Sequence, residues 1–245
     1  MDVQEEIRLH VFLARSGLCS RRCAEGWISR GKVSVDGVVI TQPGLKILPG
    51  RSIVEVDGKA VQSENLAAYF LLNKPKGIVS TARDERGRKT VLNLLPPSSG
   101  RVYPVGRLDV ASEGLMLLTN DGELAYRLTH PKFDISKTYR IAIRGCLRAQ
   151  DEERFRLGLG LGDGKTRGAS LRRLRSHGNI SEYEVILKEG RKRQIRRMIH
   201  ALGCKVLCLC RTREGCLSLG SLKPGEWRHL RQDEIRALRH EAGLA

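Results

Sequence analysis

The stretch of chain from 106 to 115 carries the acid whose setting most suggests chemistry, Asp109, two residues after Arg107. Glycines flank this acid on both sides, and an apolar run over 115–119 follows at once. Such a run is typical of a buried strand, which would hold the loop before it rigidly. A single acid beside an arginine on a rigid loop favours catalysis over packing. We therefore predict that Asp109 is a catalytic group.

A second acid, Glu113, follows Asp109 four residues later. Two carboxylates in different environments can divide the roles of general acid and general base, as in a hydrolase. This alternative predicts a cleaved product and a dependence on Glu113. We expect Glu113 to be exposed, which favours a single catalytic acid.

The chain has 245 residues, a net charge of +17 and a pI of about 10.0. This excess of positive charge favours nucleic acid or another polyanion as the partner. No run of about 18 apolar residues is present, so we expect no membrane contact. The segment 1–6 is acidic and unlike a signal peptide. We therefore expect a cytoplasmic protein.

The seven cysteines and six histidines show no spacing typical of metal ligands. A cluster of cysteines lies between 204 and 216. Val206, Cys208 and Cys210 alternate as on one face of a strand, which favours small apolar packing over zinc. We predict no metal site.

Residues 7–61 read as a compact unit of helices and short strands. The expected elements are a helix from Ile7 that stops at Gly17, a helix capped by Ser20 that runs to Arg30, and strands around Asp-Gly turns at 36–37 and 57–58.

Positive charge gathers on the second of these helices and on its flanks, at Arg15, Arg21, Arg22 and Lys32. A cluster of one sign favours RNA contact over an ordinary solvated face. The pattern from Arg8 to Gly37, with Ser20-Arg21-Arg22 and Val35-Asp36-Gly37, resembles the αL-motif ("S-four") RNA-binding module. The resemblance implies that this unit binds RNA.

Residues 66–245 read as a second domain. Strand-like and helix-like segments alternate without a strict β-α-β order, which indicates an α+β fold. The expected strands are 69–72, 137–144 and 183–187, and the expected helices begin near Asp121 and after Gly190.

Four segments of this domain stand out together: 73–77, 106–109, 137–140 and 189–198. Taken singly, each segment is weak evidence for a function. In this order and spacing they resemble the pseudouridine synthases, in particular the small ribosomal-RNA branch that carries the αL module at its N-terminus. The resemblance implies a mixed, mainly antiparallel sheet with flanking helices.

The resemblance also implies a reaction. The bond from ribose carbon 1′ to uracil nitrogen breaks, the base turns, and carbon 5 bonds to carbon 1′, so no cofactor is needed. Asp109 matches the catalytic aspartate, which attacks carbon 1′ or removes a ribose 2′ proton. Tyr139 matches the tyrosine that lies against the target base. Arg196 matches the arginine that pairs with the aspartate.

Further cations are expected to contact the substrate RNA. Arg107 matches a residue that inserts where the target base was, and a phosphate contact is the alternative. The remaining expected RNA contacts in this domain are Lys74, Arg191, Arg193 and Arg197.

The segments 69–77 and 119–124 look closest to enzymes that act on 23S ribosomal RNA, with 16S ribosomal RNA as the alternative target. The substrate could be the free RNA or a precursor particle, and a monomer is expected. A non-catalytic RNA-binding protein of ribosome assembly is the second hypothesis. The joint presence of Asp109, Tyr139 and Arg196 argues against it, because binding alone does not require an acid in a basic groove.

Overall fold

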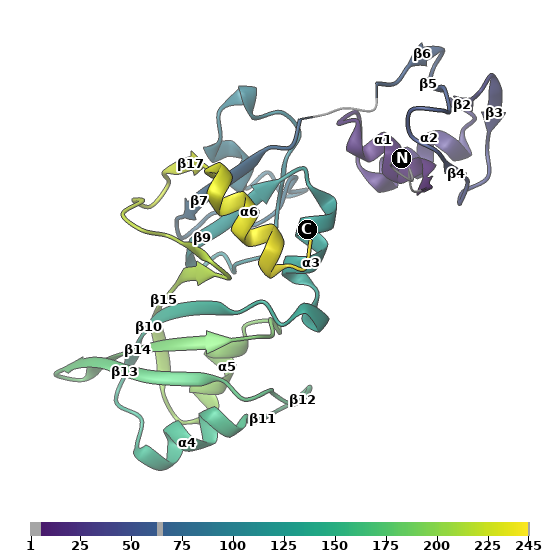
Figure 1. The fold of residues 1–245 in the computed structure, drawn as a ribbon. Helices are drawn as coiled ribbons and strands as arrows, with labels where there is room; N and C mark the ends of the chain where they lie inside the picture. Colours follow the sequence, from purple (N-terminus) through teal and green to yellow (C-terminus); the bar gives the residue numbers. More distant parts are fainter. Residues whose placement is uncertain (1–5, 63–65, 245) are drawn as a thin grey trace. The chain divides into compact units, whose positions relative to one another are not determined.

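The structure, a computed structural model, describes residues 6–62 and 66–244 (Figure 1). It divides into two compact units, 1–67 and 68–245, which we treat separately. The acidic segment 1–5 and most of the polar link expected at 62–65 lie outside the described residues.

The N-terminal unit contains two helices and several short strands. Its elements are β1 (Ile7–Arg8), α1 (Leu9–Arg15), α2 (Arg21–Ser29), β2 (Val33–Val35), β3 (Val38–Ile40), β4 (Lys46–Ile47), β5 (Val54–Val56) and β6 (Lys59–Ala60). One sheet has the order β3-β2-β5-β6, and β1 pairs with β4. The first helix begins two residues later than expected, because Ile7 and Arg8 pair with the distant strand β4.

Helix α2 begins as its sequence predicts. The Ser20 hydroxyl accepts a hydrogen bond from the Cys23 backbone N–H at 3.1 Å, which satisfies a free donor of the first turn. Ala24 and Ile28 are buried one turn apart, whereas the side of α2 that carries Arg21 and Arg22 is exposed. The amphipathic pattern therefore turns the cations of this unit toward solvent.

The C-terminal unit is an α+β domain, as expected. Its strands are β7 (Tyr69–Lys74), β8 (Tyr103–Pro104), β9 (Glu113–Thr119), β10 (Lys137–Arg144), β11 (Gly160–Leu161), β12 (Gly164–Lys165), β13 (Ser170–His177), β14 (Ile180–Leu187), β15 (Lys205–Glu214), β16 (Leu217–Ser218) and β17 (Trp227–His229). Its α-helices are α3 (Gly122–Thr129), α4 (Ala149–Leu157), α5 (Gln194–Ala201) and α6 (Gln232–Glu241). Short 3-10 helices are η1 (Val91–Leu94), η2 (Pro97–Ser99) and η3 (Pro131–Phe133).

The main sheet is mixed and mainly antiparallel, which confirms the expected architecture. Its order is β13-β14-β10-β15-β9-β7-β17, and only the β15–β9 pair among these neighbours is parallel. The parallel pair divides the sheet into two halves. Helices α4 and α5 pack on the half that contains β10, and α3 and α6 pack on the half that contains β9 (Figure 1).

The cysteines of β15 do not pack as expected. Val206 is buried, but Cys208 is exposed and Cys210 is only half-buried. The pairing of β15 with β10 contains a bulge, which breaks the strict alternation, and Leu209 takes the next buried position. The prediction of apolar packing was therefore wrong for Cys208.

Gly114 begins the close contact between β9 and β15. Its φ is +109°, and a Cβ at this position would lie 2.3 Å from the backbone oxygen of Arg211. No side chain fits there without a shift of the backbone. The glycine therefore lets the strand that follows the Asp109 loop dock directly on β15.

We expect Gly114→Ala to lower the free energy of unfolding of the C-terminal unit by roughly 3 kcal/mol or more, through overpacking and backbone strain. Gly178→Ala is the matched control, because Gly178 also has a positive φ, of +53°, but no atom within 4 Å of the added Cβ. The control is expected to cost about 1 kcal/mol. Denaturant unfolding of both variants measures the difference, and equal losses would contradict the steric argument.

Candidate active site

A cleft of about 1030 Å³ opens in the C-terminal unit, and its lining comes from the segments 79–88, 106–112 and 187–196 together with Tyr139 and Leu209. Eight cationic side chains line it, against four acidic ones. The cations are Arg83, Arg86, Arg88, Arg107, Arg191, Lys192, Arg193 and Arg196. Such a charged concave surface suits a polyanion.

Asp109 lies in the wall of this cleft and is half-buried. The cation closest to its carboxylate is Arg193, with 3.9 Å between Arg193 Nη1 and Asp109 Oδ2. Arg193 precedes α5 and has a left-handed backbone, with a φ of 52°. The start of α5 therefore brings a cation within ion-pair distance of the acid.

The loop that carries Asp109 is held through its backbone carbonyls. From Leu108 to Ser112, each of five consecutive carbonyl oxygens accepts a hydrogen bond. Side chains donate to four of them: Ser80 Oγ to the Leu108 carbonyl, Lys74 Nζ to the Asp109 and Ser112 carbonyls, and Arg196 Nη2 to the Ala111 carbonyl. Backbone N–H groups complete the set: that of Ser112 donates to the Asp109 carbonyl, and that of Gly77 to the Val110 carbonyl. The acid is therefore positioned before any substrate binds.

Lys74 has a structural role in place of the expected RNA contact. Its side chain is fully buried, and Nζ donates to the carbonyls of Pro75, Asp109 and Ser112 at 3.0, 3.3 and 2.8 Å. Burial lowers the pKa of Lys74 to about 8, although the nearby charge of Asp109 opposes this shift. A residue with no exposed surface cannot reach a phosphate, so that prediction was wrong.

Arg196 also supports the loop. We expected it to pair with Asp109, but Nη2 donates to the Ala111 carbonyl at 2.9 Å and Nη1 to the Val206 carbonyl at 3.3 Å. Burial lowers the pKa of Arg196, and Asp109 is close enough for its charge to oppose that shift. Among the described residues, Arg193 instead of Arg196 forms the ion pair with Asp109.

Tyr139 connects the two halves of the sheet. It is half-buried, lines the cleft and packs against the apolar clusters of both halves. Ile141 and Ile143, on the same face of β10, are fully buried. Burial raises the pKa of the Tyr139 hydroxyl, so the phenol is neutral at physiological pH. A neutral aromatic ring in the cleft wall can stack on a base.

Arg107 is exposed in the cleft wall next to the Asp109 loop. In the part of the chain that the structure describes, its guanidinium makes no hydrogen bond or ion pair, which leaves its donors for a ligand. Glu113 does not line the cleft, and it lies 3.5 Å from Lys76 Nζ. Because Asp109 lines the cleft and Glu113 does not, the two acids do not face one substrate, which argues against the two-carboxylate alternative.

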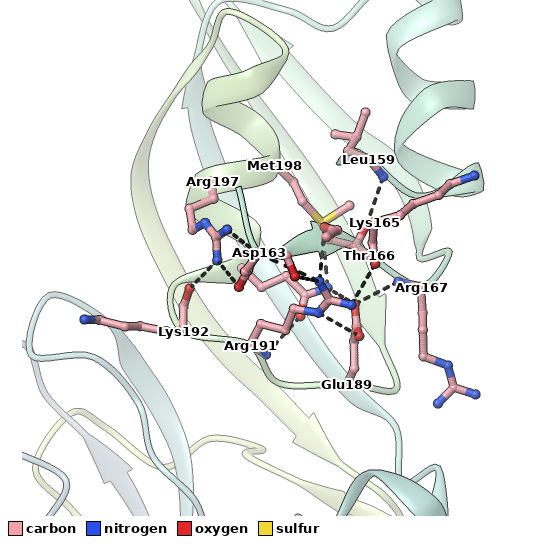
Figure 2. Close-up of polar contacts among 12 residues, drawn as sticks. Leu159, Asp163, Lys165, Thr166, Arg167, Glu189, Arg191, Lys192, Arg197 and Met198 are labelled. Atoms are coloured by element: carbon pink, nitrogen blue, oxygen red, sulfur yellow. Dashed lines mark hydrogen bonds and ion pairs between the residues drawn. The ribbon is translucent and has the colours of Figure 1, made fainter. Parts of the chain in front are cut away.

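Arg191 and Arg197 hold the β11–β12 hairpin (Figure 2). Arg191 donates to the carbonyls of Gly164 and Lys165 at 3.2 and 2.7 Å, and Arg197 binds both carboxylate oxygens of Asp163. The hydrogen bond from Arg197 lowers the pKa of Asp163 to about 2. Both guanidinium groups are therefore engaged within the protein, and we leave them out of the proposed RNA surface.

The expected RNA-binding cations of the N-terminal unit differ in whether they form an ion pair within the protein. Arg15, Arg21 and Arg22 are exposed, and no ion pair of theirs is found within 6–62. Lys32 lies 3.2 Å from Asp57 and is exposed. The three arginines are therefore the most accessible cations of this group.

Two features of the cleft were not predicted from the sequence. The buried Ser80 binds the backbone of Leu108 through its hydroxyl, and no sequence pattern marks it. The segment 83–88 also lines the cleft, and its charge run Arg-Asp-Glu-Arg-Gly-Arg could have indicated it. Its Asp84 holds Arg88, and this hydrogen bond lowers the pKa of Asp84 to about 2.

Within 6–62 and 66–244 no group of three or more metal-binding side chains is found. No helix among these residues is long and apolar enough to cross a membrane.

Comparison with known proteins gives two family matches. The profile of the RNA pseudouridylate synthase family matches residues 68–201, and the S4 domain profile matches residues 7–53. An uncharacterized RNA pseudouridine synthase of Aquifex aeolicus is 40% identical over 98% of this chain and 96% of its own length. Ribosomal large subunit pseudouridine synthase B of Bacillus subtilis is 41% identical over 95% of each chain.

A solved structure agrees with these matches. The crystal structure of a pseudouridylate synthase is 30% identical, with a TM-score of 0.67 over 95% of this chain and 99% of that one. Both resemblances seen in the sequence are confirmed. The chain belongs to the RNA pseudouridylate synthase family and carries an S4 domain before its synthase domain.

Proposed function

We propose that this protein converts a specific uridine of large-subunit (23S) ribosomal RNA to pseudouridine, with Asp109 as the catalytic carboxylate. The observation that carries the proposal is a single acid on a fully hydrogen-bonded loop in a cationic cleft. The names of relatives such as the Bacillus subtilis enzyme support the large subunit as the source of the RNA. The proposed partner is ribosomal RNA, and the protein is proposed to act as a monomer.

The proposed chemistry needs one ionised acid. Asp109 attacks ribose carbon 1′ as a nucleophile, or it removes a proton from carbon 2′, and either route breaks the bond from carbon 1′ to uracil nitrogen. The base then turns and carbon 5 bonds to carbon 1′, which in the nucleophilic route breaks the bond from carbon 1′ to Asp109; carbon 5 loses its proton and the released uracil nitrogen gains one. The product has the same atoms as the substrate, so neither a donor group nor an oxidant enters.

The neighbouring side chains divide the remaining tasks. Arg193 places its positive charge 3.9 Å from the Asp109 carboxylate. Arg196 and Lys74 hold the loop through carbonyl oxygens. Tyr139 offers its ring to the uracil. In this assignment Arg196 and Lys74 are positioning residues, and Asp109 and Tyr139 touch the substrate.

The target base must leave its stack to reach the cleft, which costs a few kcal/mol. The exposed Arg107, beside the acid, is placed to occupy the vacated position or to bind a phosphate. Lys192 and Arg193 extend the cationic wall. In the N-terminal unit the proposed RNA contacts are Arg15, Arg21, Arg22 and Lys32.

The test is release of tritium from carbon 5 of uracil. We expect the purified protein to release label from a 23S transcript, at one site per molecule, and not from a 16S transcript. Release from the 16S transcript alone would overturn the large-subunit assignment. A precursor particle of the large subunit serves as a third substrate. Tight RNA binding without release from any of the three would contradict catalysis and favour an RNA-binding protein of ribosome assembly.

A further inference from the structure

A cluster of aromatic and cationic side chains covers the end of α3 and the turn η3. The rings of Tyr126 and Phe133 lie 5.7 Å apart, and the His130 ring lies 5.1 Å from that of Tyr126. Lys132 Nζ lies 4.7 Å from the Phe133 ring centroid and 5.5 Å from that of Tyr126. Tyr126 is 48% exposed, and His130 and Lys132 are also exposed. We call these four residues the aromatic platform.

The platform presents unused polar groups to solvent. The Tyr126 hydroxyl and the Lys132 ammonium have no hydrogen bond or carboxylate partner among the residues that the structure describes. Two acids close in sequence pair with other cations: Glu123 lies 3.5 Å from Arg127, and Asp134 pairs with Arg167. The positive charge of Lys132 is therefore held over aromatic faces and is not neutralised by an acid.

Hydrogen bonds hold the backbone that carries the platform. The Asp121 carboxylate caps α3 and also accepts hydrogen bonds from the Tyr69 hydroxyl at 2.9 Å and from Arg239 at 2.8 Å. His130 Nδ1 accepts from the Lys132 backbone N–H at 3.2 Å, which fixes the turn. The guanidinium of Arg127 lies 5.0 Å from the Phe133 ring centroid. The backbone of the platform is therefore ordered before a ligand binds, which lowers the entropy cost of binding.

The platform adjoins the cleft on two sides. A Cβ on Gly106, which lines the cleft, would lie 3.5 Å from Thr129 Cγ2 on the last turn of α3. On the other side, Asp134 follows the platform and pairs with Arg167 at 2.6 Å. The Arg167 N–H donates to Glu189, which is another lining residue. The segments on either side of the platform therefore contact residues at the edge of the cleft or their direct partners.

We propose that the platform binds an unpaired nucleotide of the substrate RNA next to the target uridine, with its base on Tyr126 and its phosphate on Lys132. Exposed aromatic rings beside unneutralised cations are the combination that holds single-stranded RNA. A carboxylate-rich partner would use the cation but not the open ring. This inference rests on the proposed function, because it assigns a second contact for the same RNA.

The test measures the affinity of full-length variants for the 23S transcript at several salt concentrations. Tyr126→Ala is expected to weaken binding roughly 5- to 100-fold through lost stacking, whereas Tyr126→Phe stays within about two-fold. Lys132→Ala is expected to lower the salt slope by about 0.7, as for one phosphate contact on a single strand. The matched controls are Leu157→Ala and Lys205→Ala, which are exposed but do not line the cleft.

Two further readouts decide the inference. Ultraviolet crosslinking followed by mass spectrometry is expected to find a nucleotide on the peptide that contains Tyr126. Unchanged affinity in both Tyr126→Ala and Lys132→Ala, with no crosslink to Tyr126, would overturn the proposal that the platform binds RNA. Equal losses of affinity in the two control variants would also overturn it. Tritium release by the wild-type protein is measured in parallel, so a failure of the proposed function is seen separately from a failure of the platform.

Discussion

Asp109→Asn is expected to reduce pseudouridine formation by at least about 10³-fold, because an amide neither attacks carbon 1′ nor removes a proton. The substitution keeps the shape of the side chain, and the loop carbonyls keep their donors Lys74, Ser80 and Arg196. Affinity for the 23S transcript is expected to stay equal or to rise, since a negative charge leaves a cationic cleft. Tritium release and filter binding measure the two effects.

The matched control for this prediction is Glu85→Gln. Glu85 is an exposed acid that lines the same cleft, so its replacement changes the charge of the cleft by the same amount. We expect this variant to keep its rate within a few fold. Comparable rates in Asp109→Asn and the wild type would contradict the catalytic assignment, and a comparable loss in Glu85→Gln would assign the effect to charge alone.

Lys74→Met is expected to lower the free energy of unfolding of the C-terminal unit by roughly 2–4 kcal/mol, because the carbonyls of Pro75, Asp109 and Ser112 each lose the hydrogen bond from the buried Nζ. The methionine fills most of the volume of the lysine, so the loss reports on hydrogen bonds more than on a cavity. Tritium release is expected to fall as well, since the freed loop no longer positions Asp109. Denaturant unfolding and single-turnover rates measure both.

The neighbouring Lys76→Met is the control for this variant. Lys76 is exposed and lies 3.5 Å from Glu113, and such surface pairs contribute little to stability. We expect a change of less than about 1 kcal/mol in the free energy of unfolding. If both variants lost the same stability, the buried hydrogen bonds of Lys74 would not be the cause.

The lowered pKa of Lys74 also predicts how stability depends on pH. Between its folded pKa of about 8 and the ordinary value of 10.5, the unfolded chain binds a proton that the folded chain has released. Stability therefore rises with pH through this window, by up to about 3 kcal/mol from this one group. Lys74→Met lacks this contribution, so the stability of the wild type relative to the variant should grow from pH 8 to pH 10. A constant difference would show that Lys74 has an ordinary pKa in the folded protein.

Local pattern was enough to predict the elements that carry the site. The run 115–119 predicted a buried strand, and β9 is buried from Gly114 to Thr119. Ser20 predicted the start of α2, and the apolar spacing after Gly190 predicted α5, with Ile195, Met198 and Ile199 buried. These predictions succeed because capping, periodicity and alternation depend on residues that are close in sequence.

The partners of the long polar side chains could not be predicted in this way. Lys74 reaches the Ser112 carbonyl from 38 residues away, and Arg196 reaches the Ala111 carbonyl from 85 residues away. A sequence shows that a cation is present, but not whether an RNA phosphate or a backbone oxygen satisfies it. Packing decides this, because a side chain that is enclosed must find its acceptors inside the protein.

The sequence by itself therefore determined the fold class, the family and the presence of an acid, Asp109, on a glycine-flanked loop in a basic chain. Only the tertiary structure decided that Arg193, and not Arg196, pairs with Asp109. It also decided that Cys208 faces solvent, because the bulge between β15 and β10 changes the alternation. In each case the physical reason is the same: contacts between distant strands and loops set the direction of a side chain, and no local pattern contains that information.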